Sequence, residues 1–153
     1  MTVIPCSTPV GRPAFVVNVE VFLEREGRWL FLRRGVGESH APGVLAGVGG
    51  KVEGEDAGPG VLERAARREV AEEVGLDLTG IDLTYVESTC FVTDDGDPVI
   101  NVVFSGHLPP TAVPTPTSPE EVAALTWLTL PEAQTTPTCP PWLLPTLSRL
   151  ASK

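Results

Sequence analysis

Runs of apolar residues predict a chain made mainly of strands around one central helix. Residues 14–23 form the longest run, which is rich in Val and Phe and long enough for a buried strand. A polar turn at 24–28 leads into a hairpin partner, 35–45 reads as a loop, and an Asp-rich turn at 94–97 joins a second hairpin. The strands expected after the first are 29–34, 83–93, 99–108 and 124–130.

A helical repeat of apolar residues lies between these strands. Its members recur at every fourth position and so share the face that we expect to cover the sheet: Leu62, Ala66, Val70 and Val74. Gly75 follows and predicts the end of that helix. We expect Trp29 and Trp127 in the core, and a short helix from Pro131. A last helix over 141–151 should pack on the sheet through Trp142, Leu143, Leu147 and Leu150.

Composition indicates a single domain over residues 1–153, with 1–13 as a flexible arm and 110–119 as a Pro/Thr-rich surface loop. The chain is 42% apolar and 20% charged, without a run of 18 apolar residues, so we expect no membrane span. A net charge of −9 argues against a nucleic-acid-binding surface. The 3 cysteines are widely spaced and support neither disulfides nor a zinc site. Because the N-terminus lacks a signal region, we expect a cytoplasmic protein.

The segment 68–76, Arg-Glu-Val-Ala-Glu-Glu-Val-Gly-Leu, carries the strongest chemical signal. Glu69, Glu72 and Glu73 stand at i, i+3 and i+4, so they share one face of a helix. Like charges at this spacing repel and destabilise a helix. One interpretation is a solvated acidic face. The other is a metal site, in which Mg²⁺ or Mn²⁺ removes the repulsion because these ions prefer oxygen ligands.

The flanking residues resemble the Nudix box, a loop–helix–loop motif with the pattern Gly, five residues, Glu, seven residues, Arg-Glu-apolar-x-Glu-Glu-x-Gly-apolar. Residues 50–76 match its two ends through Gly50, Arg68, Glu69, Val70, Glu72, Glu73, Gly75 and Leu76. Arg68 lies 18 positions after Gly50, which is four more than in the pattern, and counting back eight from Arg68 reaches Gly60 instead of a Glu. We therefore interpret 55–60 as a lengthened loop, with Glu55 as a candidate for the displaced first Glu.

This resemblance, which extends over about 14–133, implies a MutT-like Nudix hydrolase: an α/β protein folded as an α/β/α sandwich with a mixed central sheet. Members cleave a nucleoside diphosphate linked to another group, with water attacking phosphorus and divalent ions bridging the phosphate oxygens. The resemblance assigns the metal to Glu69, Glu72, Glu73 and Gly50, and catalysis to Glu72, Glu69 and Glu53. It gives Arg68 a structural role, in which the guanidinium pairs with a carboxylate and anchors the helix.

Basic residues near the motif are candidates for binding the substrate phosphates. Arg33 and Arg34 end a strand where relatives often place such an Arg, although two solvated strand-end charges are the alternative. Lys51 follows Gly49-Gly50 and is either a phosphate contact or a solvated loop side chain. The two glycines, expected in a turn, would allow special backbone conformations and close approach of phosphate or metal.

The general base has two candidates. Glu53 follows the glycine pair, whereas Glu120 and Glu121 precede the Trp-containing strand, where relatives often supply a carboxylate as base or metal ligand. The alternative for that pair is the start of a helix. His40 is expected on a loop surface, with a base or phosphate contact as the alternative, and His107 is expected to be structural.

Together these inferences predict a Mg²⁺- or Mn²⁺-dependent pyrophosphohydrolase acting on a small-molecule nucleotide. The segment 47–53 resembles loops of Nudix enzymes that clear modified nucleoside triphosphates such as 8-oxo-dGTP, which yields monophosphate and pyrophosphate. The alternatives are hydrolysis of another nucleoside diphosphate derivative such as ADP-ribose, and a Nudix-fold sensor that binds without hydrolysis. The lengthened loop favours a sensor, while the three intact glutamates oppose it. We expect neither nucleic acid nor a membrane as partner, and the sequence leaves a homodimer open.

Overall fold

The structure, a computed structural model of the chain, describes residues 11–35, 43–117 and 122–152, apart from the side chain of Ala123. The strands are β1 (Val16–Arg25), β2 (Arg28–Arg34), β3 (Leu45–Ala46), β4 (Val48–Lys51), β5 (Thr84–Val92), β6 (Pro98–His107) and β7 (Val122–Leu128). The helices are α1 (Val61–Val74), α2 (Leu130–Thr135) and α3 (Leu144–Ala151), with 3-10 turns η1 (Gly54–Asp56) and η2 (Pro141–Leu143).

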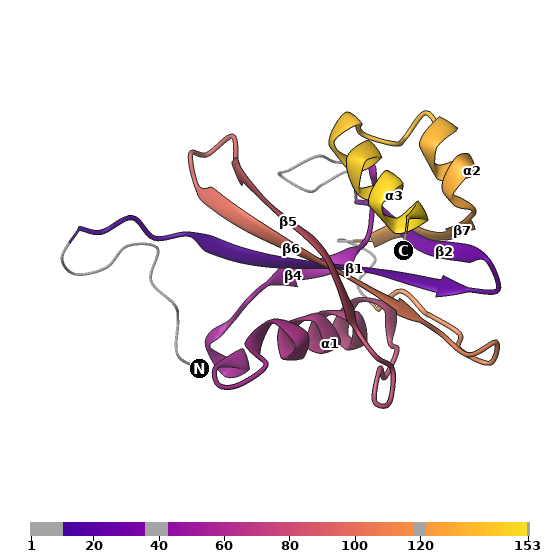
Figure 1. The fold of residues 1–153 in the computed structure, drawn as a ribbon, viewed down its shortest axis with the longest axis horizontal. Helices are drawn as coiled ribbons and strands as arrows, with labels where there is room; N and C mark the ends of the chain where they lie inside the picture. The colour runs from indigo at the N-terminus through magenta and orange to yellow at the C-terminus, as the bar shows by residue number, and fades with distance from the viewer. Residues whose placement is uncertain (1–10, 36–42, 118–121, 153) are drawn as a thin grey trace.

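The strands form one mixed sheet in the order β3-β2-β1-β6-β5, with β4 paired to β1 and β7 paired to β2. The β1–β6 pair is parallel, and the other pairs are antiparallel. Helix α1 covers one face of the sheet, while α2 and α3 lie on the other (Figure 1). This arrangement confirms the predicted α/β/α sandwich with a mixed sheet.

The central strand β1 is buried on both faces, which explains the long apolar run of its sequence. Because successive side chains point to opposite faces, Val21 packs in one core cluster with Val70 of α1. Phe22 packs in the other cluster, edge-on to Phe31 and together with Leu147 of α3. The two clusters hold the helices against the sheet through the burial of apolar surface.

Helix α1 has the predicted apolar stripe. Ala66, Val70 and Val74 are fully buried, and Leu62 packs against the same cluster. A glycine precedes the helix and another ends it, Gly60 with φ 70° and Gly75 with φ 65°. Both angles lie in the left-handed region, where glycine is favoured because it lacks a Cβ. The predicted end of the helix at Gly75 is therefore confirmed.

Two local predictions were wrong. The glycine pair after residue 48 forms part of β4 instead of a turn, because its backbone pairs with β1 and tertiary pairing outweighs the low strand propensity of glycine. Trp142 does not pack on the sheet: it lies in η2 with 61% of its surface exposed, whereas its neighbour Leu143 is buried. Trp29 and Trp127 are half-buried against the two core clusters.

The Pro/Thr-rich segment is a loop over the part that the structure describes, up to Thr117. Backbone amides of Thr115 and Thr117 donate to the carbonyl oxygens of Val74 and Glu73 at 2.8 and 3.0 Å. These bonds attach the loop to the last turn of α1. Across 11–35, 43–117 and 122–152, we find no helix of the length and apolarity that crossing a membrane requires.

Candidate active site

Arg68 joins α1 to the segment that precedes it. Its Nε and Nη2 donate to the two carboxylate oxygens of Asp56, both at 2.9 Å, and Nη2 also donates to the carbonyl oxygen of Lys51 at 2.9 Å. The planar guanidinium suits such a two-point contact. Asp56 is buried, and the bonds from Arg68 hold the pKa of its carboxyl below the usual range. The structure thus supplies a carboxylate partner for the Arg68 anchor.

Asp56 is the acidic residue that counting backward from Arg68 missed. Five residues separate it from Gly50, which is the spacing of the first Glu in the motif. The four additional residues therefore lie at 57–60. Glu55, our earlier candidate, is 47% exposed on its side chain, and its Oε1 lies 3.5 Å from Arg68 Nε. A forward count from Gly50 would have identified Asp56 from the sequence alone.

The four-residue extension folds back on the first turn of α1. The guanidinium of Arg64 donates through Nη1 to the carbonyl oxygen of Pro59 and through Nη2 to that of Asp56, the latter at 2.5 Å. Gly58, with φ 118°, lies against the same guanidinium. The extension is thus held in place by its own contacts and leaves the Arg68–Asp56 pair intact.

Strand β4 brings its two glycines against carboxylates of α1. A Cβ added to Gly50 would lie 2.3–2.5 Å from the carboxylate of Glu69, and one added to Gly49 would lie 2.0 Å from the carbonyl oxygen of Val19. The amide of Gly49 donates to Glu73 Oε2 at 3.3 Å. Neither glycine has a left-handed φ, so both are required for space and not for conformational freedom.

A cavity of about 820 Å³ opens beside this contact, within the usual range of small-molecule sites. Six of the predicted residues line it: Arg34, Gly50, Lys51, Glu53, Glu69 and Glu73. Arg33 points away, because neighbouring strand residues face opposite sides, and is exposed. Glu72 is also outside the described lining. Its side chain is 57% exposed and accepts from Arg68 Nη1 at 3.1 Å.

The cavity also has a polar floor, which the sequence analysis missed: Asn18, Glu20, Glu87, Thr89 and Asn101. Asn18 donates to Asn101 Oδ1 at 2.7 Å, and Asn101 donates to Glu20 Oε1 at 3.2 Å. Burial raises the pKa of Glu20, with repulsion from Glu87 adding to the effect, although bonds from Gly47 and Asn101 oppose it. The signal was present in the sequence, since two polar residues at alternate positions interrupt the apolar run of β1.

The residues at the end of the cavity near Gly50 fit a divalent metal only if the substrate supplies some of the ligands. Among the described residues, no three Asp, Glu, His or Cys side chains gather closely enough to hold an ion by themselves. Glu69 and Glu73 nevertheless line the same cavity as the backbone of Gly50. One or two carboxylates, completed by water and substrate phosphates, are the usual ligands of Mg²⁺. The donor set therefore fits Mg²⁺ or Mn²⁺ bound together with a phosphorylated substrate.

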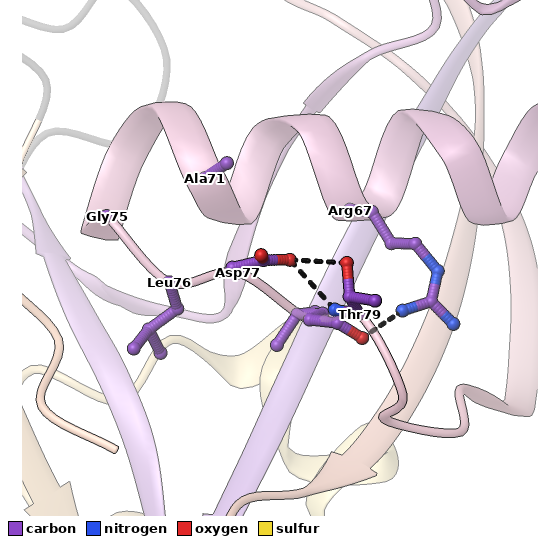
Figure 2. Close-up of a pocket in the computed structure, with 7 residues that line it drawn as sticks. Arg67, Ala71, Gly75, Leu76, Asp77 and Thr79 are labelled. Atoms are coloured by element: carbon purple, nitrogen blue, oxygen red, sulfur yellow. Dashed lines mark hydrogen bonds between the residues drawn. The ribbon is translucent and has the colours of Figure 1, made fainter.

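A second hollow, of about 230 Å³, lies at the C-terminal end of α1 (Figure 2). Arg67 donates there to the carbonyl oxygens of Leu78 and Ile81, and Asp77 accepts from the amide and hydroxyl of Thr79 at 2.9 and 2.7 Å. These bonds fix the segment that follows the helix against Arg67. None of the predicted site residues lines this hollow, and we assign it a structural role.

The remaining candidates divide into described and undescribed residues. Glu53 lines the cavity, and its amide donates to Asp56 Oδ2 at 2.8 Å. His107 lies at the exposed end of β6, 2.5 Å from Glu24 Oε2, where a structural role is expected. Glu120, Glu121 and His40 lie outside the described residues, so their roles stay predictions.

Comparison with known proteins agrees with this geometry. The family model for the NUDIX domain matches residues 14–149. Among solved structures, a MutT protein from Methanosarcina mazei Go1 is 23% identical with a TM-score of 0.74, over 90% of this chain and 94% of that one. A C. elegans Ap4A hydrolase is 16% identical with a TM-score of 0.72, over 90% and 96%. The NUDIX domain of Shewanella oneidensis NrtR, complexed with ADP ribose, is 15% identical with a TM-score of 0.71, over 95% and 94%. No curated protein matches the sequence.

The fold, the Arg68-anchored helix and the family match define the class: the chain belongs to the NUDIX domain family and is a Nudix hydrolase. The match extends beyond the 14–133 seen from the sequence and includes most of α3. Helix α3 closes one core cluster and, with η2, contributes residues to the cavity. The family region thus includes both α1, which carries the acidic face, and the residues that η2 and α3 contribute to the cavity.

Proposed function

We propose that this protein is a Mg²⁺-dependent pyrophosphohydrolase that converts a nucleoside triphosphate, in particular a modified one such as 8-oxo-dGTP, to its monophosphate and pyrophosphate. One observation carries the proposal: a single cavity joins the carboxylates of Glu69 and Glu73, the cations of Arg34 and Lys51, and the polar floor. A nucleotide has three corresponding parts, which are a metal-bound diphosphate, further phosphate charge, and a heterocycle with a hydrogen-bonding edge.

The metal would be held by Glu69, Glu73 and the carbonyl oxygen of Gly50. An ion bound there neutralises charge on the diphosphate and lowers the pKa of a bound water. Glu72 is the third predicted ligand. Its contact with Arg68 is a partly exposed ion pair, and such pairs are worth less than about 1 kcal/mol. This contact therefore does not prevent Glu72 from turning towards an ion.

The other residues act on charge and protons. Arg34 and Lys51 offset the charge of the phosphates, which a chain with a net charge of −9 otherwise repels. Glu53 is the described candidate for the general base, because it lines the cavity next to Asp56 and can accept a proton from water. Glu120 and Glu121 remain the competing candidates.

Turnover of a nucleotide panel tests the proposal. Formation of the nucleoside monophosphate would be measured by chromatography from 8-oxo-dGTP, dGTP, ADP-ribose and Ap4A with Mg²⁺ or Mn²⁺, and with EDTA as the blank. We include Ap4A and ADP-ribose because two of the similar structures are described as an Ap4A hydrolase and an ADP ribose complex. We expect metal-dependent turnover of the triphosphates. Turnover of ADP-ribose or Ap4A alone would show that the substrate belongs to that class and not to the nucleoside triphosphates. Binding of a nucleotide without turnover would contradict the proposal that the protein hydrolyses it.

The variant Glu73→Gln tests the metal assignment. The substitution keeps the size of the side chain but removes its charge, so we expect kcat to fall about 100-fold or more while the fold persists. Glu63→Gln is the matched control, since Glu63 is an exposed carboxylate in the first turn of the same helix. Circular dichroism and thermal unfolding would show that both variants are folded. Full activity of Glu73→Gln would reject the assignment.

We also propose that the enzyme acts in the cytoplasm on free nucleotides, and not on nucleic acid or at a membrane. Its strongly acidic composition is consistent with this, because a polyanion would be repelled. Cell fractionation and gel-shift assays would test these points, and sedimentation would determine whether a homodimer forms.

A further inference from the structure

The polar floor is built from side chains in register across three adjacent strands. Asn18 of β1 pairs with Asn101 of β6, which pairs with Thr89 of β5. In the next row, two positions from Asn18 and Thr89, Glu20 of β1 and Glu87 of β5 both pair with Val103 of β6. Because residues two apart share a face of a sheet, all the polar members of these rows lie on the face that carries the cavity. The sheet therefore presents a rigid set of hydrogen-bonding groups and not a mobile loop.

The hydrogen bonds within this floor leave one buried carboxylate oxygen without a donor among the described residues. Both oxygens of Glu20 already accept, one from Asn101 at 3.2 Å and one from the Gly47 amide at 3.0 Å. Glu87 Oε2 lies 3.2 Å from Arg149 Nε, while Glu87 Oε1 is buried and has no hydrogen-bond partner among the described residues. A buried carboxylate oxygen without a donor is strongly destabilising. Such groups are therefore uncommon and call for a functional explanation.

Two aromatic side chains border the same cavity. Phe91 follows Glu87 and Thr89 at alternate positions of β5 and is 38% exposed, and Trp142 of η2 is 61% exposed. Large aromatic surfaces are normally buried, and exposed ones next to a cavity suit stacking on a flat ligand. The floor and the rings together match a planar heterocycle, whose edge forms hydrogen bonds and whose face stacks.

We propose that the polar floor binds the nucleobase and selects bases that present a ring N–H beside an exocyclic amino group, with Glu87 Oε1 as the acceptor. Among the common bases this edge belongs to guanine. Thymine and uracil flank their ring N–H with carbonyl oxygens, which a carboxylate repels, and adenine and cytosine present an acceptor nitrogen beside the amino group. The inference rests on the proposed function, because it assigns the base end of the same cavity.

The test compares substrates that differ in one group. dITP has the guanine ring without its exocyclic amino group, so we expect kcat/KM for dGTP to exceed that for dITP by about 10-fold or more, and that for dTTP by about 100-fold or more. Glu87→Gln should lower kcat/KM for dGTP by about 10- to 100-fold and that for dITP by less, because one hydrogen bond to a charged acceptor is lost. Equal rates for the three nucleotides would overturn the inference.

Glu24→Gln is the matched control. Glu24 is a carboxylate of the same sheet that lies outside the described lining of the cavity, so the substitution removes the same charge without touching the floor. If Glu24→Gln and Glu87→Gln change base preference equally, Glu87 is not the selecting residue. Calorimetric binding of dGMP and dIMP to the wild-type protein needs neither turnover nor a variant. Tighter dGMP binding without any hydrolysis would uphold the base assignment and reject the proposed function, and equal binding would reject the base assignment alone.

Discussion

The substitution Asp56→Asn should destabilise the protein by about 2–3 kcal/mol, although it replaces only one carboxylate oxygen with an amide group in a side chain that does not line the cavity. Asp56 is 3% exposed and accepts three bonds, two from Arg68 at 2.9 Å and one from the Glu53 amide at 2.8 Å. Breaking a buried ion pair by removing one partner costs about 3–5 kcal/mol. We lower that value because Arg68 retains bonds to Glu69 and to the Lys51 carbonyl oxygen.

Thermal and urea unfolding measure this loss. For a domain of this size, about 1 kcal/mol corresponds to a change in Tm of about 2–4 °C, so we expect Tm to fall by about 5–10 °C. Glu55→Gln is the control, because Glu55 is half exposed and lies 3.5 Å from Arg68. It should change stability by less than about 0.5 kcal/mol. If Glu55→Gln destabilises as much as Asp56→Asn, the assignment of Asp56 as the anchor is wrong.

Three further predictions concern pH, the glycine strand and the phosphates. Arg68 lowers the pKa of Asp56 from its reference value of 3.8, so the stability that Asp56 provides is present above that pH and is lost as pH falls through the lowered pKa. The difference in unfolding free energy between wild type and Asp56→Asn should therefore be constant from about pH 5 to 8 and shrink below about pH 4. Urea titrations at each pH would measure this difference. Gly50→Ala should abolish activity but not folding, because the added Cβ meets only the carboxylate of Glu69. Gly49→Ala should impair folding, because the added Cβ meets the backbone of Val19. Circular dichroism and activity assays separate the two outcomes, and a folded, active Gly49→Ala would contradict the close contact between Gly49 and β1. Arg34→Ala should raise KM about 10-fold and Arg33→Ala should not, because only Arg34 lines the cavity; equal KM values in steady-state kinetics would exclude the phosphate role.

Much of the fold follows from local sequence. The strand of residues 16–25 is recognisable because burial on both faces gives it a long apolar run. The stripe on α1 is recognisable because burial of one face imposes a period of nearly four on a helix. The end of this helix can also be predicted from the sequence, since Gly75 takes a left-handed φ that few other residues adopt. The strand conformation of the glycine pair in β4 could not be predicted in this way, because it arises from pairing with β1, which is far away in sequence.

The active site also has one part that follows from local sequence and another that depends on the tertiary structure. The sequence by itself determined the acidic helix, because Glu69, Glu72 and Glu73 owe their common face to helical geometry alone. A forward count from Gly50 reaches Asp56, and the tertiary structure shows why Asp56 and not the adjacent Glu55 is the buried partner of Arg68. Asp56 is buried against the guanidinium, whereas Glu55 is exposed.

The polar floor shows why the rest of the site required the fold. Asn18, Asn101 and Glu87 belong to three strands, and no local pattern relates them. They become neighbours only through the register of β1, β6 and β5, which is set by the whole sheet. Local sequence thus determined most of the elements and the acidic helix, whereas the pairing of distant strands decided the cavity, because hydrogen-bond register is a property of the assembled sheet.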